Sequence, residues 1–246
     1  MPAVRENKYD DPVFFEKYGR MDRSRLGLSA AGEWPELEKL LPDFAGRRVL
    51  DLGCGYGWHC RYARDRGAAS VLGVDLSERM LAEARARGSE GIEYRRAAME
   101  DVAFDDGSFD VILSSLALHY VADFRPLAAA MARWLSPGGR LVFSVEHPVF
   151  TADGPQDWCY GPNGEKRHFP VDHYFEEGRR EAVFLGEPVV KYHRTVTTYL
   201  GAVLESGLTL RAVVEPQPPA AMLDQPGWRD ELRRPMMLLV AADKPL

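Results

Sequence analysis

The chain has 246 residues, of which 46% are hydrophobic, and its 31 Lys and Arg against 37 Asp and Glu give a formal net charge of −6 at pH 7. A chain of this length buries about 70–75% of its unfolded surface without a disulfide framework, and three cysteines, an odd and sparse number, indicate a reducing compartment. The excess of acidic residues differs from the basic composition typical of nucleic-acid binding, so we expect no nucleic-acid partner. No window approaches the roughly 18 apolar residues of a membrane span, so we expect a cytoplasmic protein without a membrane partner.

Residues 1–32 are polar with interspersed aromatic side chains, and they predict one short helix around 12–21 followed by a loop. An aromatic and basic segment placed before a parallel sheet can fold over a bound ligand, so we expect Tyr18 and Arg23 to belong to such a lid. The apolar residues of 33–41 then share one face of an amphipathic helix that ends at Pro42.

The stretch 48–60 breaks from an apolar strand into a turn with glycine at positions 53, 55 and 57, and then resumes helical spacing. Alternate glycines let the main chain approach a ligand closely, and the following helix offers its N-terminal N–H groups. This pattern predicts a cradle for a nucleotide or cofactor. Cys54, His59 and Cys60 match no zinc spacing, so we expect no metal there.

Strands and helices alternate through the next part of the chain. Strands are expected at 70–75, 92–96, 109–115 and 140–146, with helices at 58–67, 77–88 and 123–135. This alternation predicts a parallel sheet covered on both faces by right-handed crossovers.

The segment from 148 to about 190 is rich in proline, glycine and aromatic residues, and it predicts a long irregular insertion that serves as a lid or a substrate-binding loop. A helix is then expected from His193 to near Gly207. Strands follow at 208–215 and 236–241, separated by a polar excursion at 216–234.

Asp75 ends the second strand, at the edge where parallel sheets bind their ligands, and lies 22 residues after Gly53. Its carboxylate can accept hydrogen bonds from both hydroxyls of a ribose, which fits more than one nucleotide cofactor. The dinucleotide fingerprint places glycine three residues after Gly55, where this chain has Trp58. An NAD-linked oxidoreductase is therefore the less favoured alternative.

An ordered set of motifs runs through the first 147 residues: the run Val49 to Gly57, Asp75, the Glu100-Asp101 loop, the strand Phe109-Asp110-Val111-Ile112 followed by Leu118-His119-Tyr120, and Pro137-Gly138-Gly139. Together they resemble the class I S-adenosylmethionine-dependent methyltransferases, most closely the small-molecule branch that includes ubiquinone-biosynthesis-like enzymes. The resemblance covers about residues 33–147.

The resemblance implies a Rossmann-like α/β fold: a seven-stranded, mainly parallel sheet with helices on both faces and an antiparallel last strand. We expect one domain with four parts, which are an N-terminal helical cap (1–32), a cofactor-binding core (33–147), a lid or substrate insertion (148–192) and a C-terminal helix with strands that complete the sheet (193–246).

The implied cofactor is S-adenosylmethionine, and the implied product is S-adenosylhomocysteine. The resemblance implies that the methionine moiety contacts the main chain of Gly53, Cys54 and Gly55, that Asp51 orients the turn or meets the amino group through water, and that a carbonyl of Ser114 or Ser115 lies near that amine. It implies that Asp75 holds the ribose. The adenine is then flanked by Leu76 and Met80, and its edge meets the main chain of Ala98, Met99 and Glu100. Leu76 and Met80 fit a helix–sheet core as well.

The methyl donor is already activated, so the protein has to align the acceptor, exclude water and, for a hydroxyl acceptor, remove a proton. His119 and His147 follow the fourth and fifth strands at the carboxyl rim of the sheet, and with Glu146 they are the expected catalytic residues. Strand alternation sends Glu146 and His147 to opposite faces. Walls for the acceptor are expected from aromatic residues: Tyr120, Trp158 and Tyr160.

We therefore expect methyl transfer from S-adenosylmethionine to an oxygen or nitrogen of a small-molecule metabolite, by a cytoplasmic monomer or homodimer. Catechol-type relatives bind magnesium through acids at the end of the fourth strand, where this chain has serines, so no metal is expected. The alternative from another class is a catalytically silent S-adenosylmethionine-binding scaffold or regulator, which would bind the cofactor without turnover.

Overall fold

A computed structural model describes residue 5 and residues 7–246. Its central sheet has the strand order β10-β11-β5-β4-β1-β2-β3. Neighbours among β1 to β5 pair in parallel, whereas β11 is antiparallel to both β5 and β10. The strands are β1 Arg48–Leu52, β2 Ser70–Asp75, β3 Ile92–Arg96, β4 Phe109–Ser115, β5 Leu135–Glu146, β10 Thr209–Val214 and β11 Met237–Asp243. The predicted seven-stranded sheet with a reversed last strand is confirmed.

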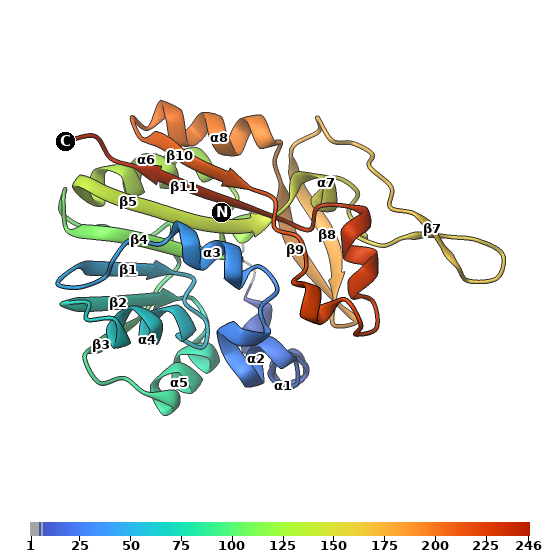
Figure 1. The fold of residues 1–246 in the computed structure, drawn as a ribbon, viewed down its shortest axis with the longest axis horizontal. Helices are drawn as coiled ribbons and strands as arrows, with labels where there is room; N and C mark the ends of the chain where they lie inside the picture. Colours follow the sequence, from blue (N-terminus) through green and yellow to red (C-terminus); the bar gives the residue numbers. More distant parts are fainter. Residues whose placement is uncertain (1–4, 6) are drawn as a thin grey trace.

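Helices cover both faces of this sheet (Figure 1). One face is covered by α3 (Trp34–Leu40), α4 (Trp58–Asp65) and α5 (Glu78–Arg87), and the other by α6 (Phe124–Trp134) and α8 (Val196–Glu205). Successive residues of a strand point to opposite faces, so Val49 packs in the cluster under α4 while Leu50 packs in the cluster under α6. Both faces of the strands are therefore apolar, as a doubly covered sheet requires.

The N-terminal cap contains more helix than the sequence predicts. It consists of η1 (Lys8–Asp10), α1 (Pro12–Gly19), α2 (Asp22–Leu26) and η2 (Gly27–Ala30). The single helix predicted at 12–21 ends at Gly19. The N–H groups of Arg20 and Met21 donate to the carbonyls three residues earlier, as in a 3₁₀ helix, and α2 begins after them. Residues 1–4 and 6 of the predicted cap lie outside the described residues.

The insertion after β5 is irregular only in part, so that prediction is wrong for the segments that form a helix and strands. It contains the short helix α7 (Pro148–Thr151), a small hairpin of β6 (Cys159–Tyr160) and β7 (Lys166–His168), and a longer hairpin of β8 (Gly178–Phe184) and β9 (Glu187–His193). Alternate residues of β9 are buried, but two of them are Lys191 and His193. Polar residues at inward positions hide the alternation on which strand prediction depends.

Two boundaries differ from the prediction by three residues or more. His193 ends β9 instead of opening a helix, and α8 begins at Val196, where the Thr195 hydroxyl accepts a hydrogen bond from the Thr198 N–H (3.1 Å). β5 begins at Leu135, which already pairs with Phe109, whereas the predicted strand begins at residue 140. The excursion at 216–234 contains two short 3₁₀ helices, η4 (Ala220–Met222) and η5 (Trp228–Arg233).

Two segments far apart in the sequence meet beyond the carboxyl ends of the parallel strands, where Figure 1 shows α1 and α2 near the β8–β9 hairpin. Phe14 of α1 packs with Ala182 of β8 and Val189 of β9, and the Lys17 ammonium lies 2.7 Å from a carboxylate oxygen of Glu187. We call these two segments, residues 7–30 and 178–193, the roof. Among the described residues, no helix has the length and apolar composition to cross a bilayer.

Candidate active site

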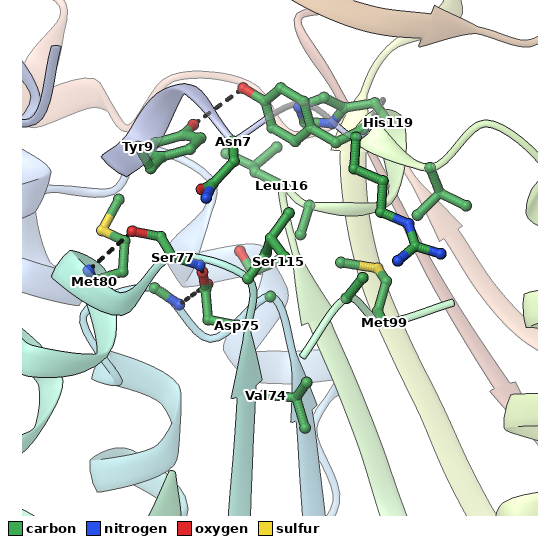
Figure 2. A pocket seen from close by; sticks show the side chains of 18 of the residues that line it. Asn7, Tyr9, Val74, Asp75, Ser77, Met80, Met99, Ser115, Leu116 and His119 are labelled. Carbon is green, nitrogen blue, oxygen red and sulfur yellow. Dashed lines mark hydrogen bonds between the residues drawn. The ribbon is translucent and has the colours of Figure 1, made fainter. Parts of the chain in front are cut away.

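A cavity of about 240 Å³ lies between the roof and the ends of β1, β2 and β4. Figure 2 shows Asp75 and Ser115 at the ends of their strands, with Tyr9 and His119 at the far edge of the cavity. Most of the site residues predicted from the sequence line it: Tyr18, Arg23, Gly53, Gly55, Asp75, Leu76, Met80, Ala98, Met99, Glu100, Ser115, His119 and Glu146. The structure thus gathers residues from the cap, the glycine turn and four strand ends around one space.

The glycine turn is held against β2 by its own main chain. The N–H groups of Gly53 and Cys54 both donate to the Val74 carbonyl, at 2.8 and 3.0 Å. Gly53 has φ +76°, and a Cβ added there would lie 2.3 Å from the Cβ of Ala117. Gly55 has φ +53°, but a Cβ added there would meet no atom within 4 Å. The turn therefore leaves free space at Gly55, which lines the cavity.

Asp75 connects the turn to the next helix. One carboxylate oxygen accepts the Gly55 N–H at 2.8 Å, and the other accepts the Ser77 N–H at 2.9 Å. Burial raises the pKa of Asp75 to about 6, although these two hydrogen bonds favour the ionised form. Each oxygen of an ionised carboxylate keeps further acceptor capacity, so Asp75 can accept two hydroxyl groups in the cavity.

Tyr18 and Arg23, which the sequence predicts to belong to a lid, both line the cavity from the N-terminal cap. The Arg23 guanidinium is half-buried and lies 2.6 Å from a carboxylate oxygen of the buried Glu33. Trp58 occupies the position where the dinucleotide fingerprint has glycine. Its ring packs against Gly27 of the cap so closely that a Cβ added to Gly27 would lie 2.6 Å from the ring. The residue at that position therefore serves packing between the turn and the cap.

His119 and Glu146 face the cavity next to each other. The His119 Nδ1 accepts the Glu146 N–H at 3.4 Å, which leaves the ring hydrogen on Nε2 in the neutral form. Burial lowers the pKa of His119 to about 4, so the ring is neutral near pH 7. The Glu146 carboxylate is buried, which raises its pKa, but the Lys191 ammonium at 2.5 Å outweighs burial and holds the pKa below its usual value.

His147 does not face the cavity, so its predicted catalytic place is wrong. Its Nδ1 accepts the Val149 N–H at 3.0 Å at the start of α7, and its Nε2 lies 2.9 Å from a carboxylate oxygen of Glu215. The side chain points away from Glu146 because neighbours on a strand alternate between faces. His147 is a helix cap in this structure.

Three predicted cofactor residues also lie outside the cavity lining: Asp51, Cys54 and Ser114. The Asp51 carboxylate accepts a hydrogen bond from the Cys60 thiol at 3.2 Å, and its burial raises its pKa to about 7. The Ser114 hydroxyl donates to the Leu52 carbonyl at 2.7 Å. The Asp51 and Ser114 side chains connect β1, β4 and α4 behind the turn. Their positions in the sequence do not distinguish this structural role from contact with a ligand.

Two of the three predicted aromatic walls are wrong. Tyr120 lines the cavity, but Trp158 packs on Phe169, and the Tyr160 hydroxyl donates to the Asp157 carboxylate at 2.7 Å while half of its side chain is exposed. Trp158 and Tyr160 belong to the loop and small hairpin of the insertion, away from the roof.

Other residues line the cavity that sequence reasoning missed: Asn7, Tyr9, Ser77, Leu116, Phe184, Met236 and Met237. Most of them come from the roof or from the end of β11, where only tertiary contacts set the position. Leu116 has φ +51°, a conformation unusual for a residue with a side chain, and its N–H donates to the Ser144 carbonyl at 2.9 Å. Backbone strain of this kind clusters at functional sites.

Over residue 5 and residues 7–246, no group of three or more His, Cys, Asp or Glu side chains is placed to hold a metal ion. A doubly covered sheet with a glycine turn and an acidic residue at the next strand end defines a protein that binds a nucleoside-containing cofactor.

The comparisons with known proteins then identify the family. A methyltransferase domain model matches residues 50–143. A solved structure from Listeria monocytogenes, described as an S-adenosylmethionine-dependent methyltransferase, is 53% identical and superposes with a TM-score of 0.85, covering 89% of this chain and all of that chain. Another such methyltransferase, from Mesorhizobium loti, is 47% identical with a TM-score of 0.82 and the same coverage.

The ubiquinone biosynthesis O-methyltransferase of Bordetella avium is 36% identical over 117 residues, which are 46% of this chain and 47% of that protein. The chain belongs to the class I S-adenosylmethionine-dependent methyltransferases, as the sequence motifs predict. S-adenosylmethionine is its cofactor, and the open space at Gly55 beside the Asp75 carboxylate fits a nucleoside with a vicinal diol.

Proposed function

We propose that the protein transfers the methyl group of S-adenosylmethionine to an oxygen or nitrogen atom of a small-molecule acceptor. One observation carries this proposal: the cavity that contains the glycine turn and Asp75 also contains His119 and Glu146, a hydrogen-bond donor and an acceptor. The relative from Bordetella avium, an O-methyltransferase, supports an oxygen acceptor.

On the cofactor side, Asp75 holds the ribose hydroxyls, and Leu76 and Met80 flank the adenine, whose edge meets the main chain at 98–100. The Arg23 guanidinium, already oriented by Glu33, pairs with the carboxylate of the methionine part. Gly53 and Gly55 admit that part to the turn. The bound sulfonium supplies an activated methyl group, so the side chains have only to align the acceptor and receive a proton.

On the acceptor side, the His119 Nε2–H donates to the acceptor atom, and the Glu146 carboxylate accepts its hydrogen. A carboxylate of low pKa is a weak base. It is sufficient for a hydroxyl acceptor because an oxygen that gains a methyl group while it still carries its proton is strongly acidic, so the proton moves to Glu146 late in the reaction. A neutral amine becomes an ammonium ion on methylation and needs no base for the transfer itself. The acceptor lies among the apolar side chains of Val121, Phe184 and Met237.

Calorimetry with S-adenosylhomocysteine tests the cofactor side. We expect micromolar or tighter binding to the wild type, and Asp75→Ala should weaken it at least tenfold because the ribose loses two hydrogen bonds. Asp43→Ala, an exposed acid at a distance from the cavity, is the matched control. Absence of binding heat in the wild type would contradict the cofactor assignment.

Label transfer tests catalysis. Methyl-labelled S-adenosylmethionine is incubated with the protein and a metabolite panel that contains hydroxyl and amine compounds, and the labelled product is identified by mass spectrometry. Transfer to oxygen or nitrogen of a small molecule supports the proposal. Tight cofactor binding without label transfer to any compound would favour the alternative, a catalytically silent cofactor-binding scaffold.

A further inference from the structure

Lys191 is buried behind Glu146 and Gln156 is half-buried beside it, and the proposed reaction uses neither side chain. The Lys191 ammonium lies 2.5 Å from one oxygen of Glu146 and 2.9 Å from the Gln156 side-chain oxygen. The Gln156 amide N–H donates to the other oxygen of Glu146 at 2.7 Å. The three side chains therefore close a ring of hydrogen bonds, which we call the Glu146 ring.

The Glu146 ring has one member in the cavity wall and two behind it. Glu146 lines the cavity, whereas Lys191 and Gln156 do not. A buried carboxylate without a countercharge takes up a proton or turns towards water, and Lys191 prevents both. Arg194, the other cation near His119, donates to the main-chain carbonyls of Val121 and Tyr192 instead. Lys191 therefore acts on the cavity through its ion pair with Glu146, and it also helps to lower the pKa of His119 and lies 5.4 Å from the centroid of the Phe184 ring.

The cations at the cavity are also paired. Among the described residues, the cations that line it are Arg5, which pairs with Asp101, and Arg23, which pairs with Glu33. His119 is neutral and offers a single N–H. An acceptor with an anionic reacting group would meet the Glu146 carboxylate with no uncommitted cation on the acceptor side. A neutral group that donates a hydrogen bond would match the carboxylate.

We propose that Lys191 is a positioning residue that holds Glu146 as a carboxylate facing the acceptor, so that the site takes a neutral hydroxyl or amine and not a carboxylate or phosphate. This inference rests on the proposed function and deepens it. In the reaction, the bond from sulfur to the methyl carbon breaks and a bond from that carbon to the acceptor atom forms. The proton of a hydroxyl acceptor passes to Glu146, whereas a neutral amine keeps its proton and becomes an ammonium ion that pairs with the Glu146 carboxylate.

The charge of the Glu146 ring can be measured without knowing the acceptor. S-adenosylmethionine carries a sulfonium cation, and S-adenosylhomocysteine carries a neutral thioether in its place. The ratio of their affinities, measured by calorimetry between pH 6 and 9, reports the charge that the sulfonium meets. Loss of folding or general damage to the cavity would weaken both ligands and leave this ratio unchanged.

Four variants set the expected results. Lys191→Met leaves Glu146 uncompensated and should raise the affinity ratio in favour of S-adenosylmethionine by about three- to tenfold at the upper end of the pH range. Glu146→Gln leaves Lys191 uncompensated and should lower the ratio by a similar factor. Lys191→Arg keeps the charge and should return the ratio to the wild-type value, as should the double variant Lys191→Met with Glu146→Gln, which removes both charges.

If Lys191→Met and Glu146→Gln both keep the wild-type affinity ratio across the whole pH range, the positioning role of Lys191 is overturned. Should Lys191→Met fail to fold, Glu146→Gln and the double variant carry the same test. The acceptor class is tested by adding carboxylate and phosphate compounds to the label-transfer panel, where a labelled methyl ester of either would overturn it. Absence of any labelled product would contradict methyl transfer itself and would leave the affinity ratios as an independent measurement.

Discussion

The cofactor side of the cavity and its roof are built in different ways. The cofactor side comes from successive strands and the residues that follow them, so the sheet's backbone places Gly53, Asp75 and Ser115 at one edge. The roof instead joins residues 7–30 to residues 178–193 through side-chain contacts. The difference shows that the cavity residues at the strand ends are fixed by strand order, whereas the part of the cavity wall that the roof supplies depends on a tertiary contact between distant segments.

Breaking the roof should have the largest effect. Phe14 is fully buried between the two roof segments, and Phe14→Ala removes a large ring that the surrounding residues cannot replace. We expect a local loss of about 4 kcal/mol, with hydrogen-exchange protection falling in residues 7–30 and 178–193 but not in β1, β4 and β5. Phe175→Ala, at a side chain that is 89% exposed, is the control. Equal loss of protection in the sheet would show that roof and sheet unfold together.

On the cofactor side, the corresponding test is Gly53→Ala. The new Cβ would clash with Ala117 at 2.3 Å, and φ of +76° disfavours a side chain, so we expect about 3 kcal/mol of lost stability in chemical denaturation. Gly46→Ala is a matched control, because Gly46 has φ +71° and no atom within 4 Å of an added Cβ. It should cost about 1 kcal/mol, from backbone conformation alone. Similar losses for the two variants would contradict the close packing at Gly53.

A smaller effect is expected at Asp51, the buried acid behind the turn, whose raised pKa makes the stability of the protein depend on pH. The pKa of Asp51 is about 7 in the folded protein and near 4 when unfolded, so its contribution to stability is lost as pH rises between these values. Asp51→Asn removes this dependence. The free energy of unfolding of the variant relative to the wild type should therefore rise by about 2 kcal/mol between pH 5 and pH 8. A constant difference across this range would contradict the raised pKa.

The smallest effect is expected at the rim of the roof. The side chains of Lys17 and Glu187 are 38% and 26% exposed, so water and salt screen their attraction. Lys17→Met should change the thermal midpoint by an amount that corresponds to less than about 0.5 kcal/mol. A larger loss would mean that this ion pair, and not the apolar cluster around Phe14, holds the roof in place.

The same contrast explains how much the sequence predicts. β2 and β4 have the predicted limits, because a buried parallel strand is a short apolar run bounded by turn residues. The limits of β3 also match, although it is an edge strand whose residues are half-buried or exposed. Asp75 and Gly55 follow from such strands and line the cavity as predicted. The β8–β9 hairpin was missed because Lys191 and His193 occupy inward positions of β9. Those polar residues belong to hydrogen-bond networks that exist only after distant segments meet.

Errors in the predicted site have a related cause. His119 and His147 follow neighbouring strands in the same way, yet one lines the cavity and the other caps α7. Likewise Asp51 and Asp75 both lie at the ends of apolar strands, but only Asp75 reaches the cavity. Sequence position gives the correct edge of the sheet in each case. The direction of the side chain and its partners decide between ligand contact and internal support.

The three glycines of the turn are required for different reasons, which are close packing at Gly53 and Gly57 and open space for the ligand at Gly55. An added Cβ at Gly53 or Gly57 would collide with Ala117 or Tyr94, whereas at Gly55 it would enter only the open cavity. A selection for folded protein would therefore reject side chains most strongly at 53 and 57, and a selection for cofactor binding would add position 55. The recurrent glycine pattern combines a folding requirement with a chemical one, so a match to the pattern alone identifies the architecture of the turn more securely than its ligand.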